Sequence, residues 1–132
     1  RPFPILAWLG PPASLLTDSA WADMAKAGFS LCLPQNFSDP VSNQKALTLG
    51  RKYGIGLLLR DPRISYGKGK PRKDADIKAA VRQWKAESAL VGYAIKDEPS
   101  KKDFEELTGP TSISSRITPS TASSERGHTP NT

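Results

Sequence analysis

The chain has 132 residues, which is enough for one domain of ordinary size, and its hydrophobic content of 37% is low for a globular chain. No apolar run approaches the ~18 residues that a membrane-spanning helix needs, and one cysteine with one histidine excludes an internal disulfide and argues against a zinc site or a Cys–His pair. The net charge of +6 permits a polyanionic partner without requiring one.

The first 107 residues alternate short apolar runs with amphipathic segments. The apolar runs predict four strands, at residues 4–10, 29–34, 55–62 and 89–99. The intervening segments predict three helices, at residues 17–28, 43–54 and 74–88, and a fourth helix that starts at residue 100. Strands that are apolar throughout and separated by helices are typical of a parallel sheet buried on both faces.

Capping residues and apolar spacing support these helices. The residues assigned to helix ends are Thr17 or Asp18, Gly28, Gly54, Asp74 and Ser100 with Asp103. The apolar positions assigned to the buried faces are Trp21, Met24, Ala25, Ala46, Leu47, Leu49, Ile77, Ala80, Val81 and Trp84. The lone cysteine, Cys32, is predicted as a small buried hydrophobe in the second strand.

Two architectures fit this order of elements, a (β/α)8 barrel and an open doubly wound sheet. The spacing of about 28 residues between strands is close to the ~30 residues of one βα unit. A doubly wound nucleotide-binding protein usually carries a glycine-rich turn after its first strand. Here that turn is GPPASLL, whose prolines lack the amide hydrogens that a phosphate needs. The prediction is therefore an α/β fold, a partial (β/α)8 TIM barrel covering about four βα units in residues 1–107.

The composition changes abruptly at residue 108. Fifteen of the 25 residues in the segment 108–132 are Ser, Thr or Pro, and no apolar periodicity is present. Such a segment cannot bury enough surface to offset the entropy of ordering it. It is predicted as a disordered tail without function, either a Ser/Thr/Pro-rich linker or the frameshifted end of a longer barrel.

Residues 3–107 resemble the N-terminal half of bacterial (β/α)8-barrel glycoside hydrolases of the clan A type. The resemblance is carried by the order and spacing of the motifs PILAWLGPP, MAKAGF, KYGIGLLLRDPRI, LVGYAIKDEP and DFEEL. It implies an oligosaccharide or polysaccharide substrate, no cofactor and no metal. It also favours secretion or a periplasmic location, although the start, RPFPILAWLGPP, is not a convincing signal peptide.

The resemblance assigns chemistry to the end of the fourth strand, GYAIKDEP. In that group the strand ends on an acidic motif, commonly Asn-Glu-Pro or Asp-Glu-Pro, whose Glu is the general acid/base. Glu98 would therefore protonate the glycosidic oxygen, which is a poor leaving group without a proton. Asp97 would stand where Asn often binds a sugar hydroxyl. The alternative is that both acids only precede a helix and have no chemical role.

Polar and aromatic residues at the other strand ends are candidate substrate contacts. Trp8 could stack on a sugar ring or belong to the core, and Gln35 and Asn36 could bind hydroxyls or be ordinary loop residues. Asp61 and Arg63, in the RDPR sequence that also contains Arg60, could contact substrate or form a structural ion pair.

A hydrolase of this type needs a second carboxylate, at about 5–5.5 Å in a retaining enzyme and about 6.5–9.5 Å in an inverting one. The resemblance places it after strand seven, beyond the four strands predicted here. The chain alone is expected to have little or no activity, so whether it is itself an enzyme stays open. Its free sheet edges and apolar face predict self-association.

Two other functions remain as alternatives. The basic loop at residues 63–73, RISYGKGKPRK, could bind phosphate or nucleic acid, although it lacks a Walker pattern and could equally be a solvated loop. Nucleic acid is the less favoured partner. The other alternative is a carbohydrate-binding protein without catalysis.

Overall fold

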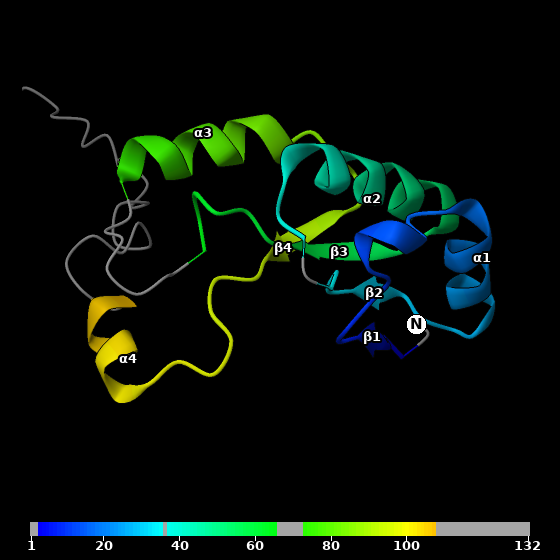
Figure 1. Cartoon of the computed structure of the whole chain (residues 1–132), viewed down its shortest axis with the longest axis horizontal. Helices are drawn as coiled ribbons and strands as arrows, with labels where there is room; N and C mark the ends of the chain where they lie inside the picture. The colour runs from blue at the N-terminus through cyan, green and yellow to red at the C-terminus, as the bar shows by residue number, and fades with distance from the viewer. Residues whose placement is uncertain (1–2, 36, 66–72, 108–132) are drawn as a thin grey trace, which may run out of the picture. The chain divides into compact units, whose positions relative to one another are not determined.

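A computed structural model describes residues 3–35, 37–65 and 73–107 of the chain (Figure 1). The chain divides into two compact units, the first ending at Asp97 and the second beginning at Glu98. The first unit contains β1 (Leu6–Ala7), a 3-10 helix (Ala13–Leu15), α1 (Asp18–Lys26), β2 (Leu31–Cys32), α2 (Pro40–Tyr53), β3 (Gly56–Leu59), α3 (Asp74–Trp84) and β4 (Leu90–Tyr93). The second unit contains α4 (Lys101–Leu107). The predicted tail, 108–132, and most of the basic loop lie outside the described residues.

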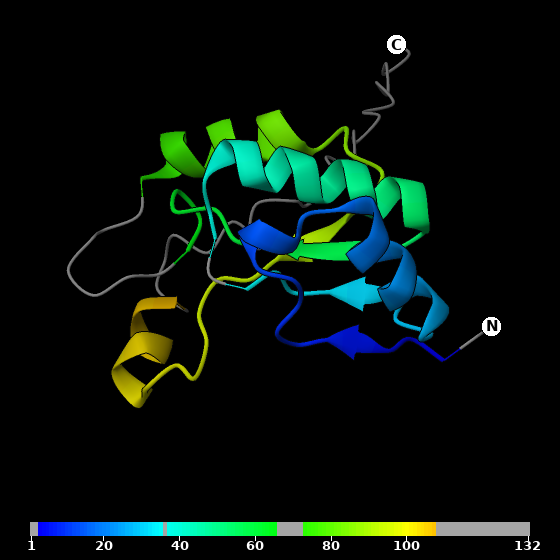
Figure 2. The same cartoon turned by 45° about the vertical axis from the view of Figure 1, so that its right-hand side comes forward.

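The four strands form one parallel sheet in the order β1-β2-β3-β4. The helices α1, α2 and α3 lie on the same side of this sheet (Figures 1 and 2). The prediction of an α/β fold with four parallel strands and intervening helices is therefore confirmed. The prediction of a sheet buried on both faces is not, because no helix of the first unit's described residues covers the second face.

The hydrogen-bonded strands are shorter than the apolar runs that predicted them. The first two contain two residues each, because only Leu6 and Ala7 pair with Leu31 and Cys32 in register. Around β2, Phe29 is half-buried and Leu33 is buried without belonging to the ladder, whereas Ile5, Trp8 and Leu9 around β1 are exposed. The first apolar run therefore predicted a strand that is both longer and more buried than the one observed.

Local side-chain contacts set the helix starts. Thr17 accepts a hydrogen bond from the Ala20 amide at 3.4 Å and caps α1, as predicted. α2 starts about one turn earlier than predicted, because Asp39 accepts from the Ser42 amide at 2.8 Å and Pro40 fits the first position.

The third helix corrects the sequence prediction at both ends. Lys73, rather than Asp74, occupies the N-cap position, and no side chain caps this end. Asp74 lies in the first turn with Asp76, where acids interact favourably with the helix dipole. The helix ends at Trp84 instead of residue 88, and the predicted core residue Val81 is exposed.

Glycine ends the first two helices as predicted. Gly28 follows α1 with φ of 89° and Gly54 caps α2 with φ of 70°, in the left-handed region that glycine occupies without strain. Gly50, inside α2, serves packing instead. A Cβ there would meet the Leu57 side chain and lie 2.5 Å from the Ile55 carbonyl oxygen. The absence of a side chain lets α2 approach β3 closely.

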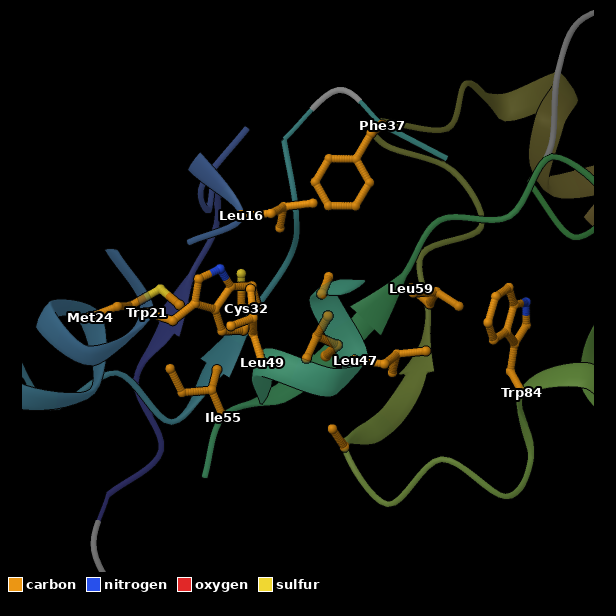
Figure 3. Packing of buried hydrophobic residues seen from close by; sticks show 13 residues of the cluster. Leu16, Trp21, Met24, Cys32, Phe37, Leu47, Leu49, Ile55, Leu59 and Trp84 are labelled. Atoms are coloured by element: carbon orange, nitrogen blue, oxygen red, sulfur yellow. The ribbon is translucent and has the colours of Figure 1, made fainter. Parts of the chain in front are cut away.

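One hydrophobic cluster joins the helices to the sheet (Figure 3). It includes Trp21 from α1, Cys32 from β2, Leu47 from α2, Leu57 from β3 and Trp84 from α3, all nearly or fully buried. Cys32 is buried as predicted, and burial raises the pKa of its thiol to about 11. The thiol therefore stays protonated at neutral pH and is a poor nucleophile.

The second unit confirms the predicted start of the fourth helix. The Asp103 amide donates to the Ser100 hydroxyl oxygen at 3.4 Å, and the Ser100 amide donates to the Asp103 carboxylate at 2.8 Å. This reciprocal arrangement is a capping box with Asp in the place of Glu. None of the helices in the described ranges is both long enough and apolar enough to cross a membrane.

Candidate functional site

A pocket of about 210 Å³ lies at the carboxyl end of the sheet. We call it the strand-end pocket. Its wall contains the residue that immediately follows each of the four strands: Trp8, Leu33, Arg60 and Ala94. Ser65 and residues 95–97 complete the lining. The carboxyl ends of parallel strands are where α/β proteins commonly bind ligands.

Backbone hydrogen bonds hold the walls of the strand-end pocket beyond the short strands. The Leu33 amide donates to the Ala7 carbonyl at 2.9 Å, and the Gly10 amide donates to the Leu33 carbonyl at 2.9 Å. On the opposite side, the Ala94 amide donates to the Leu59 carbonyl at 2.9 Å. These bonds continue the sheet for one more residue and fix the positions from which the lining side chains project.

Arg60 is held through its backbone. The Asn43 side-chain amide, buried at the start of α2, donates to the Arg60 carbonyl at 2.8 Å and to the Ser38 carbonyl at 3.3 Å. The Arg60 side chain is half-buried and forms no ion pair within the described residues. The RDPR sequence contains Arg60 but does not distinguish it as a site residue. Asn43 was not predicted, because no local pattern indicates that an asparagine inside a helix will bind a distant carbonyl.

Asp61 and Arg63 form the structural ion pair that was one of their two predicted alternatives. Asp61 is 2% exposed, and Arg63 donates to its two carboxylate oxygens at 2.9 and 2.6 Å. The Arg63 amide and the Trp84 indole donate to the same carboxylate, each at 2.9 Å. Neither residue lines the strand-end pocket, so their pairing fastens the loop after β3 to α3.

The electrostatics of this pair follow from its partners. Burial raises the pKa of Asp61, but the hydrogen bonds from Arg63 and Trp84 outweigh burial and hold the pKa below its ordinary value. The Asp61 carboxylate in turn raises the pKa of Arg63. Burial, followed by the charge of Asp61, raises the pKa of Tyr93, whose hydroxyl is buried without a hydrogen-bond partner in the described chain.

The remaining predicted substrate contacts fall in different places. Trp8 is 55% exposed and lines the strand-end pocket, so its assignment to the core is wrong while its contact with sugar stays a prediction. Gln35 is half-buried and pairs through its backbone with Pro12 in an isolated parallel bridge, outside the pocket lining. Asn36 lies outside the described residues.

Asp97 lines the strand-end pocket, and Glu98 follows it directly as the first residue of the second unit. Both side chains are exposed. Among the described residues, Glu98 is the one non-glycine residue with a positive φ, at 46°. This conformation costs an L-residue about 1–2 kcal/mol. Because the cap of α4 is made by Ser100 and Asp103, the helix start does not account for Glu98.

In the described ranges, no three His, Cys, Asp or Glu side chains gather into a group that could hold a metal ion. Comparison of the chain with protein-family models, curated proteins and solved structures gives no match. Function must therefore be inferred from the residues and their geometry.

Proposed function

We propose that residues 3–107 are the N-terminal half of a (β/α)8-barrel glycoside hydrolase and that the strand-end pocket binds a sugar ring of an oligosaccharide. The observation that carries the proposal is the pocket itself, lined by the residue after each of four consecutive strands. A (β/α)8 barrel builds its active site at that end of the sheet.

The sheet topology supports the barrel over a doubly wound sheet. In a doubly wound sheet the strand order reverses at a switch point and the helices are divided between the two faces. Here four parallel strands follow one another in chain order, and α1, α2 and α3 share one side (Figure 2). Further βα units added in the same sense would curve the sheet toward closure, with the open face becoming the barrel interior.

The proposed roles divide between binding and chemistry. The exposed Trp8 ring offers a face on which a sugar ring can stack, and the Asp97 carboxylate can accept hydrogen bonds from hydroxyls. Glu98, next to Asp97 in the chain, is the general acid/base. Its unusual backbone conformation supports a functional role, because strained residues concentrate at functional sites.

The same proposal predicts binding without turnover by this chain. The nucleophile or base that must act with Glu98 belongs to strand seven of a whole barrel, and a single carboxylate cannot complete either glycosidase mechanism. The proposal also includes export of the protein to the periplasm or the medium, where polymeric sugars are degraded.

The test is to titrate the 15N-labelled chain with a panel of soluble oligosaccharides and to follow the indole resonances of the tryptophans. We expect saturable shifts at Trp8 that are insensitive to salt for neutral sugars, and in Trp8→Ala the loss of the accompanying shifts at the backbone amides of the other pocket-lining residues. Phe104→Ala is the control, because Phe104 is also 55% exposed but does not line the pocket.

Three results would contradict the proposal. One is the absence of binding across the panel. The second is robust glycoside turnover by this chain alone. The third is binding only to nucleic acid or phosphate with a steep salt dependence, which would instead favour the basic loop as the functional element.

A further inference from the structure

We infer that the strand-end pocket selects an acidic sugar, with Arg60 binding the carboxylate of a uronic-acid residue. This inference rests on the proposed function, since it specifies the sugar that the same pocket takes. Its basis is that Arg60 and Arg63, which lie three positions apart in the chain, make different side-chain contacts.

Arg63 is paired with other groups of the protein. Its guanidinium donates to Asp61 at 2.9 and 2.6 Å and to the Gln83 side chain at 2.8 Å. Arg60, by contrast, lines the strand-end pocket half-buried and has no ion-pair partner in the described ranges. A partly desolvated guanidinium without an anion is unfavourable, and its planar fork matches a carboxylate with two parallel hydrogen bonds.

The backbone of Arg60 is fixed before any ligand arrives. The Asn43 amide holds its carbonyl at 2.8 Å, and Asn43 is itself buried in the first turns of α2. A fixed backbone restricts the volume that the guanidinium can sample, so less entropy is lost when it binds an anion. Asn43 is therefore a positioning residue for this contact.

The charge of the lining favours a monoanion. Arg60 and Lys96 contribute two positive charges and Asp97 one negative charge, so the pocket wall has a net charge of +1 at neutral pH. A single carboxylate near Arg60 neutralises this net charge. A phosphate dianion would instead leave a net charge of −1 in a pocket of about 210 Å³.

The remaining lining groups favour a sugar over a simple carboxylic acid. Trp8 presents an exposed ring face, while Asp97 and the Ser65 hydroxyl can accept hydrogen bonds from ring hydroxyls. A uronic-acid residue uses all three kinds of contact, namely the cation, the hydroxyl acceptors and the aromatic face. A small carboxylate uses only the first.

The test compares two ligands that differ only in the methylation of their three carboxylates, a trigalacturonate and its fully methyl-esterified form, by calorimetric titration of the full chain. We expect the acid to bind about tenfold or more tightly than the ester. Arg60→Gln should bring the affinities for acid and ester to about the same value, whereas Arg60→Lys should keep part of the preference for the acid. Arg82→Gln, which alters an exposed arginine of α3 outside the pocket lining, is the control, and circular dichroism confirms folding of every variant.

The outcomes separate this inference from the proposed function. Equal binding of acid and ester, or a preference unaffected by Arg60→Gln, overturns the inference and leaves the sugar site standing. Binding of acetate or inorganic phosphate as tightly as the trigalacturonate also overturns it. If neither oligosaccharide binds and a wider panel of sugars gives the same result, the proposed function fails as well.

Discussion

The two faces of the sheet differ sharply in what covers them. Toward the helices, Leu57 and Leu59 of β3 are completely buried. On the other face, Leu31 and Leu58 are half-buried and Val91 is 59% exposed. A Cβ on Gly56 would touch both Leu31 and Val91, which confirms that these side chains share the second face. The sheet is apolar on both faces, but the first unit supplies a core for only one.

The helix-covered face contains the buried residues that stabilise the fold. The residues of the other face are only half-buried or exposed. The proposed half barrel would account for this difference, because the second face of such a sheet is buried only when further strands close it. Substitutions on either face test this difference.

The largest effect is expected at Leu57. Leu57→Ala removes a fully buried side chain from the centre of the cluster and should lower the free energy of unfolding by about 3 kcal/mol. Leu58→Ala, the same change one residue later and on the opposite face, should cost about 1 kcal/mol. Urea unfolding followed by tryptophan fluorescence measures both. Equal losses would show that the two faces are equally packed.

The next effect is expected at Asp61. Asp61→Asn breaks the buried pair with Arg63 and weakens the bond from Trp84, which should cost about 2–3 kcal/mol at neutral pH. Because the folded-state pKa of Asp61 is lowered, its contribution is present above the ordinary value of 3.8 and is lost as the pH falls through the folded value. The stability gap between wild type and variant should therefore narrow below about pH 4.

Asp97→Asn is the control for this experiment, since Asp97 is exposed and has no comparable buried partners. Thermal unfolding at a series of pH values measures the gap. A gap that stayed constant down to pH 2.5 would contradict the assigned role of the Asp61 carboxylate.

A smaller effect is expected at Asn43, which links α2 to the strand end. Asn43→Ala removes the hydrogen bonds to the carbonyls of Arg60 and Ser38 and should cost about 1–2 kcal/mol. The released Arg60 should also lose part of its preference for an acidic sugar. Lys45→Ala, on the exposed side of α2, is the control for both measurements. Wild-type selectivity in a destabilised Asn43→Ala would remove Asn43 as a positioning residue.

The smallest effect on stability is expected at Val91. Val91→Thr keeps the branched shape on the exposed face and should change the free energy of unfolding by less than about 0.5 kcal/mol.

The Val91→Thr variant should, however, weaken the predicted self-association of the chain. A second copy that packed its own apolar second face against this one would cover Val91. Sedimentation velocity measures association, with Val81→Thr on α3 as the control. Identical association of all three proteins would exclude this face as the contact.

Much of the fold could be predicted from local patterns. The order of strands and helices followed from apolar runs, and Thr17, Gly54 and the pair Ser100–Asp103 marked helix ends through contacts within a few residues. The predicted helix starts were wrong where more than one residue could serve as the first residue or the cap of the helix. Asp39 and Pro40 began α2 earlier than its apolar stripe did, and at α3 the chain placed Lys73 rather than Asp74 at the cap.

The candidate site was only partly predictable. The positions of Trp8 and Asp97 at strand ends predicted side chains near the carboxyl edge of the sheet, and both line the pocket. No such pattern predicted that Arg63 would bind other side chains while Arg60 would line the pocket. Both are arginines at the end of the same strand, and their difference depends on Asp61, Trp84 and Gln83.

The succession of strands and helices, the burial of Cys32 and the capping of α1 and α4 could be predicted from the sequence, because periodicity and short-range hydrogen bonds act within a few residues. The packing of the helices on the sheet was needed to show which face is covered, that Asp61 binds α3 through Trp84, and that Asn43 holds the Arg60 carbonyl at the pocket. These contacts join residues 17 and 23 positions apart. Whether such groups meet is settled by how helices pack on the sheet, and no local pattern records that packing.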